Sequence, residues 1–182
     1  MMRPESHANE VSQAFIDEAR RLLTRDYLPK IERCLETLGD EQIWWRPNAE
    51  SNSIGNLLLH LAGNARQWIV SGLGGESDNR VRQSEFDERS HIPRAELLLR
   101  LSETVGAVDR VLAKFDPKRA LDRNKIQGTE VTALEAIFHV TEHFSMHTGQ
   151  IILLTKMLGG GGLRFYDFST GAPIHTWHKD EF

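Results

Sequence analysis

The sequence predicts an all-α fold, a four-helix bundle with up-down-up-down connectivity or a close variant of it. Apolar residues recur mostly at helical spacing, no strand-like alternation is sustained, and clusters of Gly, Pro, Asn and Ser separate four such segments. The chain has 182 residues, of which 40% are hydrophobic and 26% charged, which suits one domain with a core. Four amphipathic helices bury their apolar stripes by packing together.

The first helix is expected over residues 9–38, where apolar side chains form a stripe on both sides of Pro29. Proline lacks an amide hydrogen and clashes with the preceding turn, so we expect a kink or break there. Gly39 ends the helix, and residues 43–53 (IWWRPNAESNS) form a connection because they combine a proline with an Asn/Ser cluster.

The second helix is expected over residues 54–71, with Ser53 as its N-cap and the glycines after residue 71 as its end. The polar residues 76–91 then form a long loop. Loops of this length in compact domains are often functional or mobile.

The third helix is expected to start near Pro93, which a first turn tolerates, and to close at residues 115–117. Residues 118–128 then connect it to the last helix, with a short extended piece. The long loop before Pro93 is the feature that leaves the connectivity of the bundle open.

The fourth helix is expected to start with Thr129 or Thr132 as its cap and to run to Leu158, where the four glycines 159–162 stop it. We therefore predict a bundle domain over residues 1–162. Residues 163–182 form a C-terminal extension that packs on the bundle or on a dimer partner.

The charge and cysteine content narrow the function classes. The formal net charge of −4 argues against non-specific nucleic-acid binding, which requires a basic face. No apolar stretch resembles a signal peptide or a membrane helix, so the expected location is the cytoplasm. The single cysteine, Cys34, cannot form an internal disulfide or a multi-cysteine zinc site, and we expect it to be buried.

Four of the eight histidines fall inside predicted helices, at positions 60, 139, 143 and 147. His143 and His147 are four residues apart, so their rings project from one helix face and can meet one ion. Neutral imidazole suits Zn, Ni, Fe or Cu. Such a pair also arises by chance, and two ordinary, partly buried histidines are the alternative interpretation.

His60 favours the metal-binding interpretation over two ordinary histidines. It lies beside the apolar stripe of the second helix, aligned with Asn56, Asn64 and Gln67. A histidine from one helix and a pair from another make a three-nitrogen site that leaves a position open for water or substrate. We therefore predict that His60, His143 and His147 bind one divalent metal ion. Hydrogen-bonded core histidines without a metal remain the alternative.

Further side chains are candidates for contacts with the ligand rings: His139, Asn64, Gln150 and Glu142. Two familiar motifs are absent from the sequence. A metalloprotease helix reads H-E-x-x-H, but Phe144 follows His143, and a di-iron bundle requires Glu three residues before His, which no helical histidine has.

The segments NSIGNLLLHLAGNARQW and HVTEHFSMHTGQI, together with DEQIWWRPN, resemble the DinB-like superfamily, also called YfiT-like. The resemblance covers nearly the whole chain through Leu158. It implies a four-helix bundle with a three-histidine metal site at one end of its interior, and His60, His143 and His147 match the three ligands. It also implies nickel or zinc, with iron or manganese as further options, and a homodimer.

Characterised members of this superfamily include transferases and isomerases that use low-molecular-weight thiols. The resemblance therefore implies a metal-dependent enzyme of the thiol-dependent S-transferase kind, with a small-molecule substrate. A metal-dependent hydrolase, or a non-catalytic metal-binding or stress-response bundle, are the alternatives.

Overall fold

The computed structural model describes residues 4–159 and 162–177. Its helices and strands follow one another in this order: α1 (Pro4–Arg21), η1 (Leu22–Tyr27), α2 (Leu28–Glu36), α3 (Asp40–Ile43), α4 (Ile54–Ala65), η2 (Arg66–Ser71), α5 (Arg82–Asp87), α6 (Arg94–Ala113), η3 (Pro117–Arg119), β1 (Arg123–Ile126), β2 (Thr129–Thr132), α7 (Ala133–Met157), β3 (Tyr166–Asp167) and β4 (Ile174–His175). The predicted all-α bundle is confirmed.

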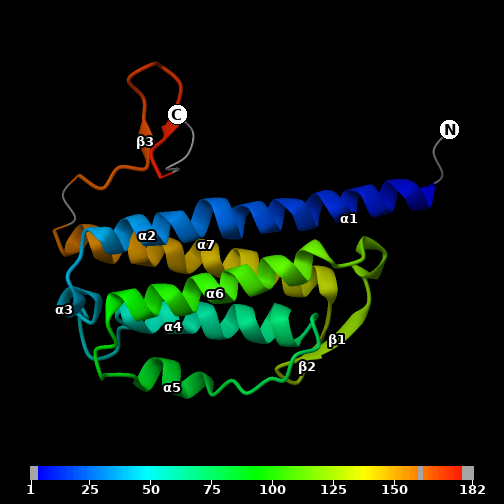
Figure 1. Ribbon diagram of the computed structural model, residues 1–182, viewed down its shortest axis with the longest axis horizontal. Helices are drawn as coiled ribbons and strands as arrows, with labels where there is room; N and C mark the ends of the chain where they lie inside the picture. The colour runs from blue at the N-terminus through cyan, green and yellow to red at the C-terminus, as the bar shows by residue number, and fades with distance from the viewer. Residues whose placement is uncertain (1–3, 160–161, 178–182) are drawn as a thin grey trace.

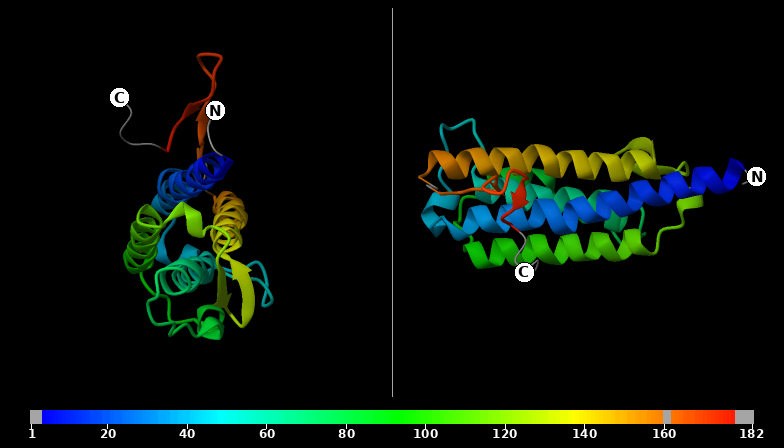
Figure 2. Two further views of the ribbon diagram at one scale, coloured as in Figure 1. Left: turned by 90° about the vertical axis from the view of Figure 1, so that its right-hand side faces the viewer. Right: turned by 90° about the horizontal axis from the view of Figure 1, so that it is seen from above.

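Four helical columns make up the bundle: α1 with η1 and α2, α4 with η2, α6, and α7 (Figures 1 and 2). Column α4 packs against α6 and α7, and the first column packs against the same two on the other side. The connectivity is a variant of simple alternation, because α4 and α6 run parallel. The segment between them, which carries α5, returns along the outside of α4 to the end where α6 begins.

The first column does not break at Pro29. The π-helical turn η1 stands directly before α2, and Pro29 occupies the first turn of α2. A proline there needs no amide donor, and the wider turn before it absorbs the disrupted i→i−4 ladder. The predicted kink is thus a π-turn within a continuous helical column.

Capping residues fix the starts of the two helices that carry the predicted metal ligands. Ser53 Oγ accepts a hydrogen bond from the amide of Asn56 at 3.2 Å and starts α4. Thr132 Oγ1 accepts from the amide of Glu135 at 3.1 Å, and the Glu135 carboxylate accepts from the amide of Thr132 at 2.6 Å. Both arrangements are capping boxes, so Ser53 and Thr132 are confirmed as caps.

Two elements differ from the sequence-based prediction. Helix α5 lies inside residues 76–91, which were expected to be a loop. The short extended piece predicted within residues 118–128 is β1, and β2, which was not predicted, pairs with it in an antiparallel hairpin whose turn places Gln127 and Gly128 at φ of 52° and 79°. Positive φ at both central positions is the geometry of a type I′ turn, which glycine favours.

The described part of the C-terminal extension forms the hairpin β3–β4 and stands outside the first column (Figure 1). Trp177 Nε1 donates to the carbonyl of Arg25 at 3.3 Å, and Lys30 Nζ lies 4.1 Å from the Trp177 ring centroid. Gly160, Gly161 and residues 178–182, which include His178, lie outside the described residues. The division into a bundle domain and an extension stays a prediction.

The core consists of the apolar stripes of the four columns, and Cys34 is buried within it as predicted. Burial raises the pKa of the Cys34 thiol to about 11, so the thiol is protonated at neutral pH. Among residues 4–159 and 162–177, no helix is both long and apolar enough to span a membrane.

Candidate metal centre

The three predicted ligands lie together in the seam between α4 and α7. His60 comes from α4, and His143 and His147 come from successive turns of α7. Each offers a ring nitrogen within 4.8 Å of the others, and the Nε2 atoms of His60 and His143 are 2.9 Å apart. The triad could therefore hold a metal ion. It lies partway along both helices, not at the bundle end that the resemblance implied.

Burial keeps these rings in the form that binds metals. His60, His143 and His147 are between 5% and 9% exposed. Burial, and then the proximity of His147 and the other histidines, lowers the pKa of His143 to about 3, and burial also lowers the pKa of His147. Both rings are therefore neutral at pH 7, and a neutral imidazole has the lone pair that a cation needs.

The tautomer of His60 is set by a buried carboxylate. His60 Nδ1 lies 2.8 Å from Glu85 Oε2 and 3.1 Å from Arg80 Nη2. We assign the ring proton to Nδ1, where it pairs with the nearer carboxylate, and this tautomer leaves the lone pair of Nε2 directed toward His143 and His147. Burial raises the pKa of Glu85, but the hydrogen bonds from Arg80 and His60 outweigh that effect, so the net shift is downward. Glu85 is consequently ionised and accepts a hydrogen bond from His60.

A second side chain fixes the ring of His147. Its Nδ1–H donates to Gln150 Oε1 at 2.7 Å, which turns the lone pair of Nε2 toward the other rings. Gln150 therefore holds the position that the sequence suggested for it, beside a ligand ring. Fixing ring orientation in this way is the usual role of hydrogen bonds behind metal-bound histidines.

The other three candidates stand farther from the triad. His139 packs beside His143 with ring centroids 5.3 Å apart, and its Nε2 accepts from Asn64 Nδ2 at 3.1 Å. Asn64 thus hydrogen-bonds to His139, and none of its hydrogen bonds among the described residues goes to a triad ring. Glu142 is exposed, and none of the hydrogen bonds within the described residues joins it to a ligand ring.

Sequence reasoning missed Glu85 and Arg80, which lie in the segment that was expected to be a loop. Arg80 donates through Nε to Glu85 Oε1 at 2.7 Å and through Nη2 to Glu85 Oε2 at 2.8 Å. Asn56 Nδ2 donates to the carbonyl of Glu85 at 2.8 Å and ties the segment to α4. The signal that could have pointed there is the polar stripe of α4, since both Asn56 and Gln67 bind this segment.

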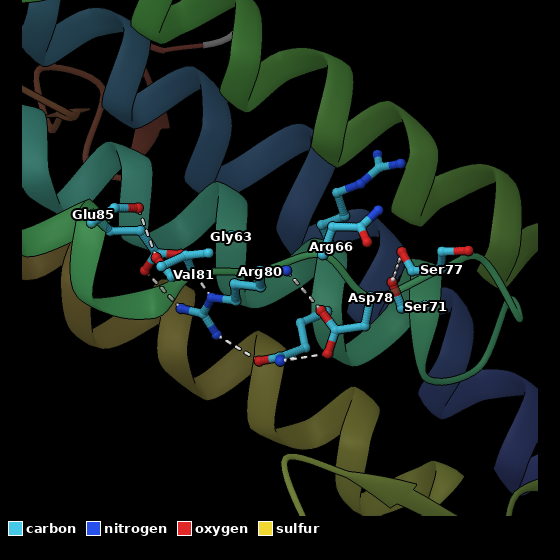
Figure 3. Close-up of a pocket in the computed structure, with 11 residues that line it drawn as sticks. Gly63, Arg66, Ser71, Ser77, Asp78, Arg80, Val81 and Glu85 are labelled. Carbon is cyan, nitrogen blue, oxygen red and sulfur yellow. Dashed lines mark hydrogen bonds and ion pairs between the residues drawn. The ribbon is translucent and has the colours of Figure 1, made fainter.

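A pocket of about 300 Å³ opens beside the Arg80–Glu85 pair (Figure 3). Polar and charged side chains dominate its lining, and Gly63, Arg66 and Asp78 contribute to it, whereas the triad does not. The ion pair therefore separates the pocket from His60. Three imidazoles, two of them held by hydrogen bonds to Glu85 and Gln150, form a donor set suited to Zn²⁺, Ni²⁺ and similar ions.

Comparisons with known proteins agree with this architecture. The family model described as "Protein of unknown function (DUF1572)" matches residues 10–171. A DinB-like protein from Bacillus cereus ATCC 10987 is 16% identical with a TM-score of 0.59, covering 73% of this chain and 86% of that chain. A DinB-like protein from Bacillus subtilis is 15% identical with a TM-score of 0.62, covering 82% of this chain and 97% of that chain. No curated protein matches the sequence.

Proposed function

Because the chain belongs to the DUF1572 family of proteins of unknown function and has the DinB-like fold, we propose that it is a metal-dependent enzyme. Its ligands are His60, His143 and His147, and its reaction transfers a low-molecular-weight thiol to an electrophilic small molecule. The observation that carries the proposal is the approach of three ring nitrogens to within 4.8 Å of one another. Imidazole suits nickel and zinc among several ions, and the DinB-like resemblance favours these two.

A divalent ion held by three imidazoles supplies a Lewis acid with a free position, at which a thiol or water loses its proton near neutral pH. The protein contributes preorganisation. Glu85 and Gln150 hold two of the rings in the tautomer that presents Nε2, and burial keeps His143 and His147 neutral. The site therefore needs little rearrangement when an ion binds.

The surroundings of the triad favour a thiol over water as the nucleophile. Water attack on a substrate is usually assisted by a side chain that accepts a proton. Among the described residues, Glu85 is the carboxylate in contact with a triad ring, and both of its oxygens already accept hydrogen bonds from Arg80 or His60. A thiol, with an ordinary pKa near 8.5, ionises at a metal without such a base.

Metal analysis of the wild type, His147→Ala and His7→Ala tests the ligand set. His7 is exposed, so its replacement is the control. We expect one divalent ion per chain in the wild type and the control and a large loss in His147→Ala, because the ion then has two protein ligands. Equal metal content in all three proteins would contradict the proposed metal site.

Cobalt substitution tests the thiol. We expect small thiols to produce a sulfur-to-cobalt absorption band in the wild-type protein. The absence of any spectral change with a panel of thiols, in a protein that holds cobalt, would contradict thiol transfer while leaving metal binding intact.

A further inference from the structure

We propose that Glu85 and Arg80 are positioning residues of the metal site. Glu85 orients His60, Arg80 braces Glu85, and the two charges cancel, so that the site keeps its attraction for an anionic ligand such as a thiolate. This inference rests on the proposed function for its metal, but its structural part concerns the chain alone.

Glu85 reaches His60 from outside the bundle. The segment between η2 and α5 runs along the outer side of α4, and Arg80 and Glu85 point from it toward that helix (Figures 1 and 3). Both side chains are nearly enclosed, with 5% of Arg80 and 10% of Glu85 exposed. A charged pair buried this deeply is costly unless every hydrogen-bonding atom is satisfied.

The surroundings satisfy that requirement. Arg80 Nη1 donates to Gln67 Oε1 at 2.9 Å, and Gln67 Nε2 donates to Asp78 Oδ2 at 2.7 Å. Asp78 Oδ1 in turn accepts from the amide of Arg80 at 3.1 Å. The network Asp78–Gln67–Arg80–Glu85–His60 thus links the segment to the predicted metal ligand His60. Its first four residues line the pocket in Figure 3.

A glycine on α4 makes room for the Arg80–Glu85 pair. Gly63 lies three residues after His60 on α4, and a Cβ atom there would lie 1.9 Å from Glu85 Oε1 and 3.0 Å from Arg80 Nε. Any other residue at this position would displace the carboxylate. The glycine therefore permits the close approach of the ion pair to the helix backbone.

The charge balance has a chemical consequence. A carboxylate behind a ligand histidine makes the ring more basic and reduces the effective charge of the site. Arg80 offsets that negative charge through two hydrogen bonds. Three neutral rings and a dication then leave the site net positive, which favours an anion at the free position.

Metal-free protein tests the orientation of His60. Two-bond ¹H–¹⁵N spectra report which ring nitrogen carries the proton. We expect the Nδ1–H tautomer in the wild type and in Glu85→Gln, whose amide oxygen still accepts, and a shift toward Nε2–H in Glu85→Ala. An unchanged tautomer in Glu85→Ala would overturn the positioning role. This readout decides the point even if the wild type binds no metal, in which case only the proposed function fails.

Zinc affinity, measured by competition with a chromophoric chelator, tests the effect on the site. We expect Glu85→Ala to bind zinc about 10- to 100-fold more weakly than the wild type, as for lost partners of other metal-bound histidines. Glu85→Gln loses the same charge but keeps the hydrogen bond, so we expect it to bind zinc about tenfold more tightly than Glu85→Ala. An equal loss in both variants, or none in Glu85→Ala, would overturn the role.

Removal of one partner leaves a buried unpaired charge, so the double variant Arg80→Leu/Glu85→Leu guards against misfolding. The double variant removes both charges together. We expect it to bind zinc as weakly as Glu85→Ala does, while its stability stays near that of the wild type. Glu76→Gln is the matched control, because Glu76 pairs with Arg66 at 2.7 Å in the same segment but is 56% exposed. We expect wild-type zinc affinity in the control.

Azide binding to the cobalt-loaded protein tests the charge balance. We expect Arg80→Met to weaken azide binding about 50-fold and Glu85→Gln to strengthen it about as much, because that is the effect of a unit charge roughly 7 Å away acting through an effective dielectric near 20. Opposite changes of azide affinity in the two variants support the cancellation of the Arg80 and Glu85 charges. Shifts in the same direction, or none in either variant, would overturn it.

Discussion

The substitution Gly63→Ala separates the role of the ion pair from ordinary helix stability. Alanine in a helix interior normally stabilises a protein by about 1 kcal/mol relative to glycine. Here its methyl group would lie 1.9 Å from Glu85 Oε1, so the carboxylate must move away from the helix. That movement stretches its bonds with Arg80 and His60, which are 2.7 to 2.8 Å long.

Hydrogen bonds to charged groups contribute about 1.5–3 kcal/mol each, so weakening one or two of them exceeds the helix gain. We expect Gly63→Ala to lower the free energy of unfolding by about 1–2 kcal/mol and the zinc affinity by about tenfold. The assays are urea denaturation and chelator competition.

The matched control is Gly106→Ala in α6, where the nearest atom to a new Cβ is the end of Arg110 at 3.4 Å. That variant should be as stable as the wild type or more stable, with unchanged zinc affinity. If Gly63→Ala behaved like Gly106→Ala in both assays, the close packing of Glu85 against α4 would have no energetic importance and the reasoning would be refuted.

Three further predictions concern the same seam. The metal-free protein should lose unfolding free energy as the pH falls from 6.5 toward 5, because His143, with a folded pKa of about 3, takes up a proton only when the chain unfolds. The contribution of His143 approaches about 1.4 kcal/mol per pH unit below the ordinary histidine pKa, and the lowered pKa of His147 adds a loss in the same direction. His143→Asn should reduce the slope in pH-dependent urea denaturation, and an unchanged slope would refute the assignment. Asn56→Ala should cost about 2–3 kcal/mol of unfolding free energy in the same assay, because it leaves the carbonyl of Glu85 unpaired; a loss below 0.5 kcal/mol, on the order of a neutral surface change, would contradict this. Gln150→Ala should weaken zinc binding about tenfold while Gln150→Glu retains it, and equal affinities in all three proteins would show that His147 needs no partner.

Much of the fold follows from local signals in the sequence. Ser53 and Thr132 cap helices through their own hydroxyls, and such contacts depend on residues three positions away. The parallel arrangement of α4 and α6 could not be predicted in the same way. It depends on where the sixteen-residue polar segment 76–91, slightly beyond the length at which loops become unusual, returns across the bundle. Helix α5 within that segment has no apolar stripe from which it could be predicted.

The histidine cluster was predictable because helical spacing places His143 and His147 on one face, and His60 lies beside the apolar stripe of the second helix. Glu85 and Arg80 were not, since they belong to a charge-rich stretch in which many acids and bases alternate. Their importance comes from a tertiary contact, the approach of that stretch to Gly63. The choice of nickel or zinc, the thiol partner and the homodimer come from the resemblance and stay predictions.

The most direct test of the account is a crystal structure of the metal-loaded protein with anomalous diffraction collected at the absorption edge of the ion. The account predicts a single strong peak about 2.0–2.1 Å from the Nε2 atoms of His60, His143 and His147. A peak at another place, or a peak bound by the two α7 histidines with the ring of His60 turned away, would contradict it.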